Sequence, residues 1–192
     1  IMLNQIGLLG GSMTIRFAFL LLCTFPAITS SQARGSSDAK AKAALAPLTK
    51  LVGQWDGEAR VSLIPGPTPQ VVRQHYDVTS GPGGTTLNLK GTGRTTTPPG
   101  KDSVVFQASA TVFYDDALGK LRVRAKLAQG GDSVLAEVEQ RPDTLIYGFP
   151  LQAGRIRFTI AYSNTDWHEV GQLILANGNA IPTVDMRLKK VK

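Results

Sequence analysis

Cysteine and histidine are scarce in this sequence. Its one cysteine, Cys23, stands near the N-terminus, and the only histidines among the 192 residues are His75 and His168. If Cys23 is removed with an N-terminal signal peptide, as argued below, the mature chain has no disulfide, thiolate metal ligand or cysteine nucleophile. Neither histidine has another histidine two to four residues away, so a zinc site would need both to converge with carboxylates across strands. We therefore expect no metal site and place both histidines at the surface or rim of the fold.

Recognisable catalytic motifs are missing too. Gly-x-Ser-x-Gly does not occur, and no serine has a recognisable supporting histidine. The segment Gly-Thr-Gly-Arg at 91–94 lacks the following helix that a phosphate cradle needs, so we interpret its glycines as hairpin residues. Two carboxylate pairs, Asp56 with Glu58 and Glu137 with Glu139, fall on the polar side of predicted strands, where burial would not separate their pKa values. We predict no catalytic residue, although a small enzyme that works at the mouth of a barrel stays a third alternative.

Only one long apolar run exists, and it lies near the N-terminus. Arg16 precedes the apolar stretch 17–28, and small or polar residues follow as far as Ala33. This order is typical of a secretory signal peptide. The run is too short for a transmembrane helix, and Pro26 interrupts it. We expect cleavage near Ala33 and a periplasmic or secreted mature protein with no transmembrane segment.

Two details of this N-terminal region leave alternatives open. Met13 is the preferred start, which makes residues 1–12 an upstream extension of doubtful translation. Cys23 could mark a lipoprotein, but Leu22 before it is not the small residue that the lipoprotein signal peptidase prefers. We therefore interpret residues 1–33 as an upstream extension and a cleaved signal peptide.

Basic residues outnumber acidic ones, 21 against 14, which gives a formal charge of +7. Removal of Arg16 with the signal peptide lowers it to +6. The basic residues are scattered along predicted strands, as at 122–126, and cluster only at 189–192. This spread argues against a nucleic-acid site but is compatible with an anionic envelope surface as a partner.

The pattern from 34 to 52 predicts a flexible leader followed by a short capping helix. Residues 34–38 are small and polar, as is usual after a cleavage site. Apolar residues then recur at spacings of three and four up to Val52, which indicates an amphipathic helix. Pro47 either begins this helix or breaks it in two, and Gly53 ends it.

From Gly53 onward the apolar period is two, as in half-buried antiparallel strands. Turn residues separate the runs at short intervals, so neighbouring strands are expected to form hairpins. We predict about ten strands in an all-β fold, a single antiparallel up-and-down β-barrel over 53–192, with a two-sheet sandwich as the competing architecture. The expected strands are 54–63, 70–79, 85–94, 103–115, 120–128, 133–140, 144–149, 154–163, 167–175 and 181–190.

A family resemblance rests on short motifs near both ends of this region. Residues 53–58 read Gly-x-Trp-x-Gly-Glu after the helix, and Asp-Trp-His-Glu at 166–169 precedes Met-Arg-Leu at 186–188. The chain resembles the calycin superfamily, and within it the secreted bacterial lipocalin-like and nitrobindin-like small barrels of unassigned function. The resemblance implies that Trp55 closes the base of the barrel and that Arg187 packs over its indole. Alternation, however, turns Arg187 away from the apolar side chains of its strand, so either that strand is bulged or the pair does not form.

The nitrobindin-like resemblance also implies an alternative with haem. Such a site needs an axial histidine inside the barrel, and His168 is the only candidate in the matching region. Nothing in the sequence around it reproduces the family's haem site. We therefore expect no cofactor and keep haem only as an alternative.

The inward face of the predicted barrel carries the candidate ligand-binding residues. Tyrosine hydroxyls buried there need a partner, which a ligand could supply, and neighbouring small residues would leave room. We therefore predict an exported barrel that binds or carries a small apolar or amphipathic molecule. The alternative is an envelope structural or interaction protein with a filled barrel and a basic surface. The candidate lining residues are Tyr76, Phe106, Tyr114, Phe158 and Tyr162, and the small neighbours are Ala108, Ala110, Ala125, Ala136 and Ala161.

Overall fold

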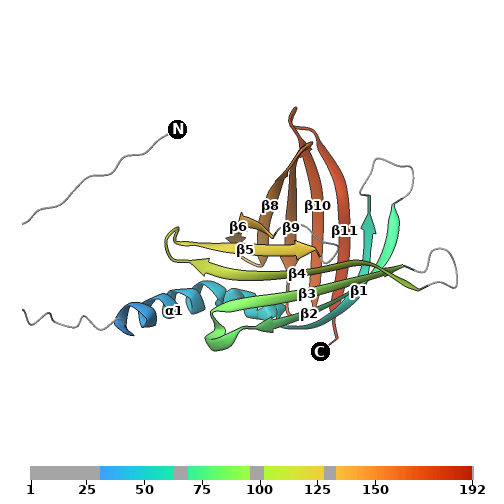
Figure 1. Cartoon of the computed structure of the whole chain (residues 1–192). Helices are drawn as coiled ribbons and strands as arrows, with labels where there is room; N and C mark the ends of the chain where they lie inside the picture. Colours follow the sequence, from blue (N-terminus) through green and yellow to red (C-terminus); the bar gives the residue numbers. More distant parts are fainter. Residues whose placement is uncertain (1–30, 63–68, 96–101, 128–132, 192) are drawn as a thin grey trace, which may run out of the picture. The chain divides into compact units, whose positions relative to one another are not determined.

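Two helical segments precede the strands in the computed structural model, which describes residues 31–62, 69–95, 102–127 and 133–191 (Figure 1). Helix α1 (Ser31–Leu45) leads directly into the 3₁₀ helix η1 (Ala46–Leu51). Pro47 stands in the first turn of η1, so the proline divides the helical region in two, one of the two outcomes that the sequence allowed. The expected signal peptide lies almost wholly outside the described residues.

Residues 34–38, for which the sequence predicted a flexible leader, belong to α1 in the structure. The helix packs along β3 and β4, where Ala41 and Leu45 are buried. The Ser37 hydroxyl donates a hydrogen bond to Asp116 in the turn that follows β4. These tertiary contacts stabilise a helical start that its small, polar composition alone did not indicate.

Strands make up the rest of the described chain, and their bounds match the expected ones within three residues. The one difference in number arises because the expected strand 133–140 divides at Val138. The strands are β1 (Gly53–Val61), β2 (Gln70–Ser80), β3 (Thr86–Thr95), β4 (Ser103–Asp115), β5 (Lys120–Leu127), β6 (Val134–Glu137), β7 (Glu139–Arg141), β8 (Thr144–Leu151), β9 (Gly154–Tyr162), β10 (Asp166–Leu175) and β11 (Ala180–Lys190), with a short 3₁₀ turn η2 (Pro82–Gly84) between β2 and β3.

All these strands belong to one antiparallel sheet in the order β6-β5-β4-β3-β2-β1-β11-β10-β9-β8-β7. The first and last long strands pair directly, with Glu58 opposite Arg187. At the other seam, β6 pairs with β5 and β7 with β8, and the Val138 amide between them donates to the Leu121 carbonyl at 2.9 Å. The sheet therefore curls into a nearly closed barrel, and the sandwich alternative is excluded for the described strands.

One end of the barrel is covered by η1. Leu48 and Leu51 are fully buried beneath Trp55, whose indole N–H donates to the Leu51 carbonyl at 2.7 Å. Each such leucine contributes about 1.5–3 kcal/mol of burial free energy. Among the described residues, no helix combines the length and the apolar character needed to span a bilayer. We call this covered end the base.

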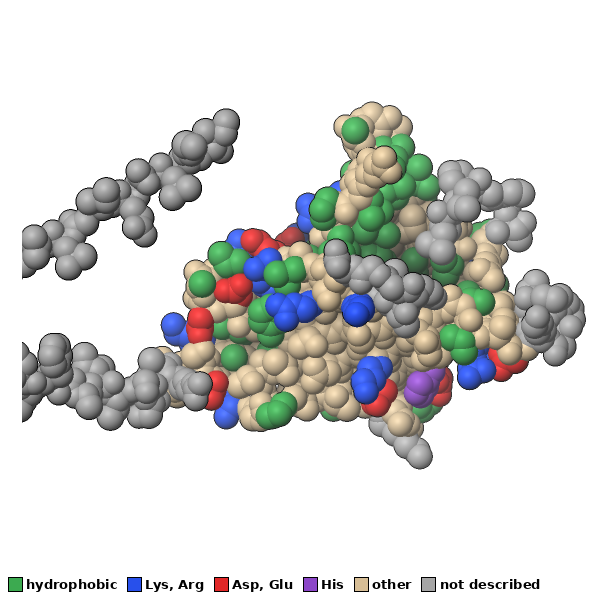
Figure 2. Space-filling model, in the orientation of Figure 1, with side chains coloured by type: hydrophobic (Ala, Val, Ile, Leu, Met, Phe, Trp, Pro, Cys, Tyr) green, Lys and Arg blue, Asp and Glu red, His purple; other side chains and the backbone are tan. Residues whose placement is uncertain are grey.

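The opposite end, the mouth, is formed where β2, β4 and β6 begin and β8 ends. Hydrophobic side chains gather on the upper part of β8–β11 in Figure 2, in contrast to the mixed charges lower down. Several apolar residues at this end are substantially exposed: Val71, Val104, Val105, Val134 and Leu151. The barrel is therefore sealed at the base, and exposed apolar side chains, on both faces of the sheet, surround its mouth.

Candidate functional site

A carboxyl group lies inside the barrel, halfway along β10. Glu169 is only 8% exposed and is flanked in the sheet by Ile160 of β9 and Met186 of β11. Burial raises the pKa of Glu169 from 4.5 to about 7, and the side chain of Trp167 opposes part of that rise. Among the described residues, no Lys, Arg or His forms an ion pair with it.

Aromatic rings lie between this carboxyl group and the base. Trp167 precedes Glu169 by two residues, so both side chains point inward. The Trp167 ring centroid lies 5.2 Å from that of Tyr76 and 5.8 Å from that of Trp55, in an edge arrangement with Trp55. The Trp167 indole nitrogen is buried, and although its side chain influences Glu169, it has no acceptor with adequate hydrogen-bond geometry.

Tyr147 of β8 brings another ring to the same region. It stacks on Phe158 with centroids 5.3 Å apart and meets Phe149 edge-on at 5.8 Å. Burial raises the pKa of Tyr147 and of Tyr76, and the charge of Glu169 raises both further. Tyr76, Tyr147 and Glu169 therefore interact electrostatically inside the barrel. We call these three residues together with Trp167 the inner cluster.

Two glycines of β3 make room for inward side chains. A Cβ atom on Gly91 would lie 2.6 Å from Cζ of Tyr76, and one on Gly93 would lie 3.0 Å from Nε2 of Gln74. Both contacts are closer than real Cβ atoms normally allow. The interpretation of these residues as hairpin glycines is wrong, because both lie within β3, where the neighbouring side chains fill the space that a Cβ would need.

Four more buried polar atoms face no partner in the described part of the chain: Oε1 of Gln74, Oγ1 of Thr183, the Tyr162 hydroxyl oxygen and Nε of Arg122. Thr183 lies at the β-bulge where β10 and β11 shift register, and its hydroxyl would be 2.9 Å from a Cβ on Gly171. The amide oxygen accepts hydrogen bonds, the Trp167 indole donates, and the threonine hydroxyl does both.

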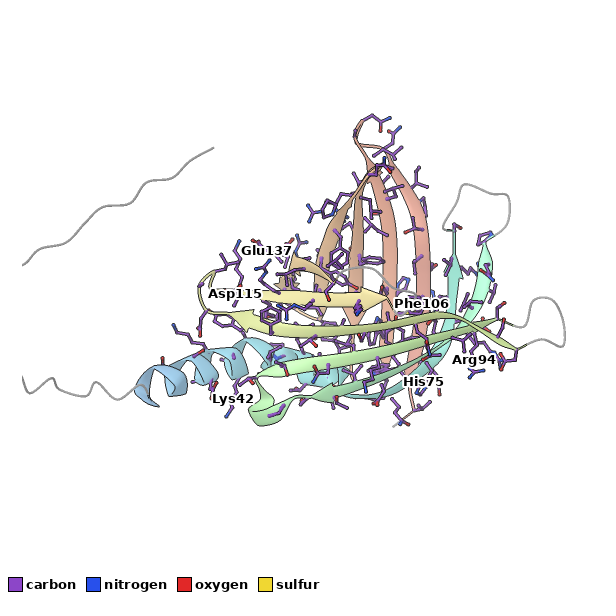
Figure 3. All side chains as sticks on the ribbon, viewed as in Figure 1. Lys42, His75, Arg94, Phe106, Asp115 and Glu137 are labelled. Carbon is purple, nitrogen blue, oxygen red and sulfur yellow. The ribbon has the colours of Figure 1, made fainter. Side chains whose placement is uncertain are left out.

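The five predicted lining residues belong to the inward face but spread over the length of the barrel. Tyr76 lies in the inner cluster, and Phe158 stacks on its Tyr147. Phe106 stands near the start of β4, toward the mouth, while His75 and Arg94 lie on the outer side of β2 and β3 (Figure 3). The other two predicted residues lie toward the base: Tyr162 pairs across strands with Trp167, and Tyr114 pairs with Leu121.

Sequence reasoning missed Glu169, Trp167 and Tyr147 as lining residues. The available signal was spacing, since Trp167, Glu169 and Gly171 alternate with His168 and Val170 on β10. Of the small residues expected to leave room inside, Ala161 is exposed, because it alternates with the buried Ile160 and Tyr162. Its assignment to the interior is therefore wrong.

Both histidines lie on the outer face. His75 Nδ1 is 2.6 Å from Asp56 Oδ1, and His168 Nε2 is 2.8 Å from Asp185 Oδ1. Strands β1 and β11 separate β2 from β10, so the two histidines belong to different pairs. The described interior thus offers no histidine to a haem iron, and its residues do not fit the haem alternative. Among the described residues, no group of three or more His, Cys, Asp or Glu is placed to hold a metal ion.

Lys190, rather than Arg187, covers the base tryptophan. Its Nζ atom lies 5.1 Å from the Trp55 ring centroid and donates to the Lys50 carbonyl at 2.9 Å. The Arg187 side chain is 71% exposed and lies 3.6 Å from Asp185. The implied contact of Arg187 with Trp55 does not form, because strand alternation directs Arg187 outward.

A shallow groove of about 480 Å³ crosses the outer face over β1–β3. Arg73 and Arg94 both pair with Asp102 there, beside the His75–Asp56 pair. These side chains are about half exposed, and such exposed pairs contribute roughly 0–1 kcal/mol. The groove is therefore a solvated charged surface, as the sequence pattern predicted for Asp56 and Glu58.

Comparison with known proteins supports the fold. No protein-family model matches the chain, and no curated protein matches it either. The crystal structure of Rv2717c from M. tuberculosis aligns with a TM-score of 0.58 and 10% identity, over 78% of this chain and 98% of that one. The S-type phycobiliprotein lyase CPES from Guillardia theta aligns with a TM-score of 0.53 and 8% identity, over 80% of this chain and 96% of its own. At such low identity these likenesses define the fold alone, and that fold is calycin-like.

Proposed function

We propose that this protein is exported and that the inside of its barrel binds or carries a small apolar or amphipathic molecule. The observation that carries the proposal is that buried polar atoms in the wall of the barrel lack partners of adequate geometry, among them Gln74 Oε1, Trp167 Nε1 and Thr183 Oγ1. Buried polar atoms in proteins are almost always hydrogen-bonded, and leaving one unpaired costs about 1–3 kcal/mol. A ligand with a polar end and an apolar body would satisfy such atoms and cover the rings.

The architecture supports the same proposal. The base is sealed by η1 and Trp55, whereas the mouth is apolar, so a molecule would enter at the mouth and stop above the tryptophans. Sites of this kind are typically apolar and contain a few convergent polar groups. A barrel of similar fold is named as a phycobiliprotein lyase, which agrees with a recognition function for this barrel without naming its ligand.

Binding is tested with the neutral fluorescent probe N-phenyl-1-naphthylamine and with native mass spectrometry of the purified chain. Two matched variants locate the site: Ala110→Leu adds bulk to the inner wall, and Ala161→Leu adds the same bulk to the outer face. We expect saturable probe fluorescence in the unmodified protein and in Ala161→Leu, and at least a tenfold weaker signal in folded Ala110→Leu.

Absence of saturable binding and of any co-purified small molecule in the unmodified protein would overturn this proposal. It would favour the alternative, a filled barrel whose basic surface contacts an anionic envelope partner. If Ala110→Leu does not fold, as circular dichroism would reveal, the unmodified protein still decides between the two.

Export is tested separately, by producing the chain with its own N-terminus in a bacterial host. We expect the protein in the periplasmic or culture fraction, with an intact mass that begins near Arg34. A full-length chain in the cytoplasmic fraction would contradict export but leave the binding proposal untouched.

A further inference from the structure

The inner cluster combines one carboxyl group with three aromatic rings. Glu169 sits on β10 above Trp167, while Tyr76 and Tyr147 reach the same region from β2 and β8. The position of Glu169 is unusual, because a carboxylate in an apolar interior is strongly disfavoured unless a cation or several hydrogen-bond donors compensate its charge. Among the described residues, no basic side chain forms an ion pair with Glu169.

The rings around Glu169 have a complementary property. The face of an aromatic ring is electronegative and attracts cations, and cages of tryptophan and tyrosine recognise ammonium groups in this way. Trp167 and Tyr76 lie 5.2 Å apart at 46°, so their rings are tilted rather than stacked face to face. Tyr147, by contrast, has one face covered by Phe158. A cationic group beside Glu169 would therefore meet the carboxylate together with the rings of Trp167 and Tyr76.

Hydrogen-bonding capacity is also available in the wall. Oε1 of Gln74, a residue only 7% exposed, is an acceptor without a partner. Gln74 and Tyr76 lie on the same inward face of β2, two residues apart. An ammonium group has three N–H donors. The Gln74 amide oxygen and the Glu169 carboxylate are both acceptors of such hydrogen bonds.

From these observations we infer that the barrel recognises a cationic amphiphile, whose protonated amine lies beside Glu169, Trp167, Tyr76 and Tyr147 and whose apolar body extends toward the mouth. This inference rests on the proposed function and names the ligand class for the same site. A carboxylic acid ligand would meet like charge from Glu169. A neutral alcohol would leave the carboxylate without a counter-charge.

Three probes of equal chain length test the inference: decylamine, 1-decanol and decanoate, each used to displace N-phenyl-1-naphthylamine at pH 8. We expect decylamine to bind at least about tenfold more tightly than 1-decanol, and decanoate to bind most weakly. In Glu169→Gln the advantage of decylamine over 1-decanol should fall to within about threefold. The control is Glu58→Gln, which removes an exposed glutamate from the outer face of β1 and should leave the preference unchanged.

The acidity of Glu169 gives a second readout that needs no variant. The titratable groups that face it from neighbouring elements are Tyr76 and Tyr147, and both stay neutral well above pH 8 because their pKa values are raised. The preference for decylamine should therefore decline from pH 8 to pH 5 as Glu169 takes up a proton. This measurement applies even if Glu169→Gln fails to fold.

The outcomes separate the inference from the proposed function. If 1-decanol displaces the probe as well as decylamine does, or if the preference is the same at pH 5 and pH 8, the amine inference is wrong while the interior still binds ligands. If no probe binds the unmodified protein, the proposed function itself fails.

Discussion

The base of the barrel and its inner cluster use tryptophan in opposite ways. At the base, Trp55 is fully buried, its indole N–H is hydrogen-bonded to the Leu51 carbonyl, and Lys190 lies over its ring. Trp167 lies on β10, which β11 separates from the strand of Trp55, and it is almost as buried. Its indole N–H has no acceptor of adequate geometry, and Glu169 follows two residues later on the same face of β10. The two rings touch, so the same small region contains a fully satisfied group and an unsatisfied one.

This difference separates what stabilises the fold from what is available to a ligand. A satisfied, close-packed base contributes to stability whether or not anything is bound. A buried carboxyl group and unpaired polar atoms reduce stability, and proteins tolerate such groups mainly at functional sites. Substitutions at the base, in the inner cluster and on the outer face test this difference.

Trp55→Ala should give the largest effect. Removing this ring deletes packing against η1 and a hydrogen bond, so the free energy of unfolding should fall by about 3–5 kcal/mol. Chemical denaturation followed by circular dichroism measures it. Trp55→Phe keeps an aromatic ring and should lose clearly less, and a loss under about 1 kcal/mol in Trp55→Ala would contradict the role of the base.

Glu169 should make stability depend on pH. Its pKa is 4.5 in an unfolded chain and about 7 in the barrel, so between these values the folded state binds more protons. The contribution of Glu169 to the free energy of unfolding is therefore fully present below about pH 4.5. It is lost as the pH rises, so that above pH 7 the free energy of unfolding is lower by roughly 3 kcal/mol. Glu169→Gln should abolish this fall, as measured by denaturation from pH 4 to pH 8.

The control for this experiment comes from three carboxylates whose pKa values are lowered rather than raised. Hydrogen bonds from Arg122, Lys120 and Lys189 lower the pKa values of Asp115, Glu137 and Asp166, respectively. Their contribution to the free energy of unfolding is present above their unfolded pKa values and is lost as the pH falls. This loss is the same in the unmodified protein and in Glu169→Gln. The difference between Glu169→Gln and the unmodified protein thus isolates Glu169, and equal pH profiles would show that its carboxyl group is not buried.

Gly91→Ala should have an intermediate effect. The new methyl group would overlap the Tyr76 ring, and overpacking of this kind costs about 1–3 kcal/mol. In a Tyr76→Ala background the same substitution should cost much less, because the overlapping ring is gone. A double-mutant cycle by denaturation measures the coupling, and additive effects would show that Gly91 and Tyr76 do not share this space.

The outer face should give the smallest effect. His75→Gln removes the exposed pair with Asp56 and should change the free energy of unfolding by no more than about 1 kcal/mol. Binding of N-phenyl-1-naphthylamine should be unchanged, since His75 lies outside the barrel. A large loss of binding in this variant would move the site to the outer groove.

Local patterns in the sequence were sufficient to predict most of the strands. β4 begins and ends at the predicted residues, because its 13 residues largely alternate between apolar and polar side chains. The division of β6 from β7 was not predictable, since Val138 continues the apolar alternation and only the pairing partners change. The contacts that α1 makes with the barrel include one at Ser37, and sequence periodicity does not contain them.

The candidate site was predicted only in part, for reasons that differ from residue to residue. Tyr76 and Phe158 were found because apolar alternation marks the inward face. Glu169 was missed as a lining residue because a charged side chain within a strand is normally assigned to solvent. Lys190 takes the place expected of Arg187 because cross-strand register and alternation, not residue type, decide which cation reaches Trp55.

The most direct test uses the indole N–H resonances of the two tryptophans, recorded by ¹⁵N–¹H correlation spectroscopy and assigned with Trp55→Phe. During titration with decylamine, and with N-phenyl-1-naphthylamine as the neutral probe, the Trp167 signal should shift saturably, because its indole belongs to the inner cluster beside Glu169. The Trp55 signal should shift far less, because its N–H is held by the Leu51 carbonyl. If binding saturates while neither indole signal moves and only resonances of outer-face residues change, the ligand does not occupy the barrel, and the proposal that the barrel interior binds it is wrong.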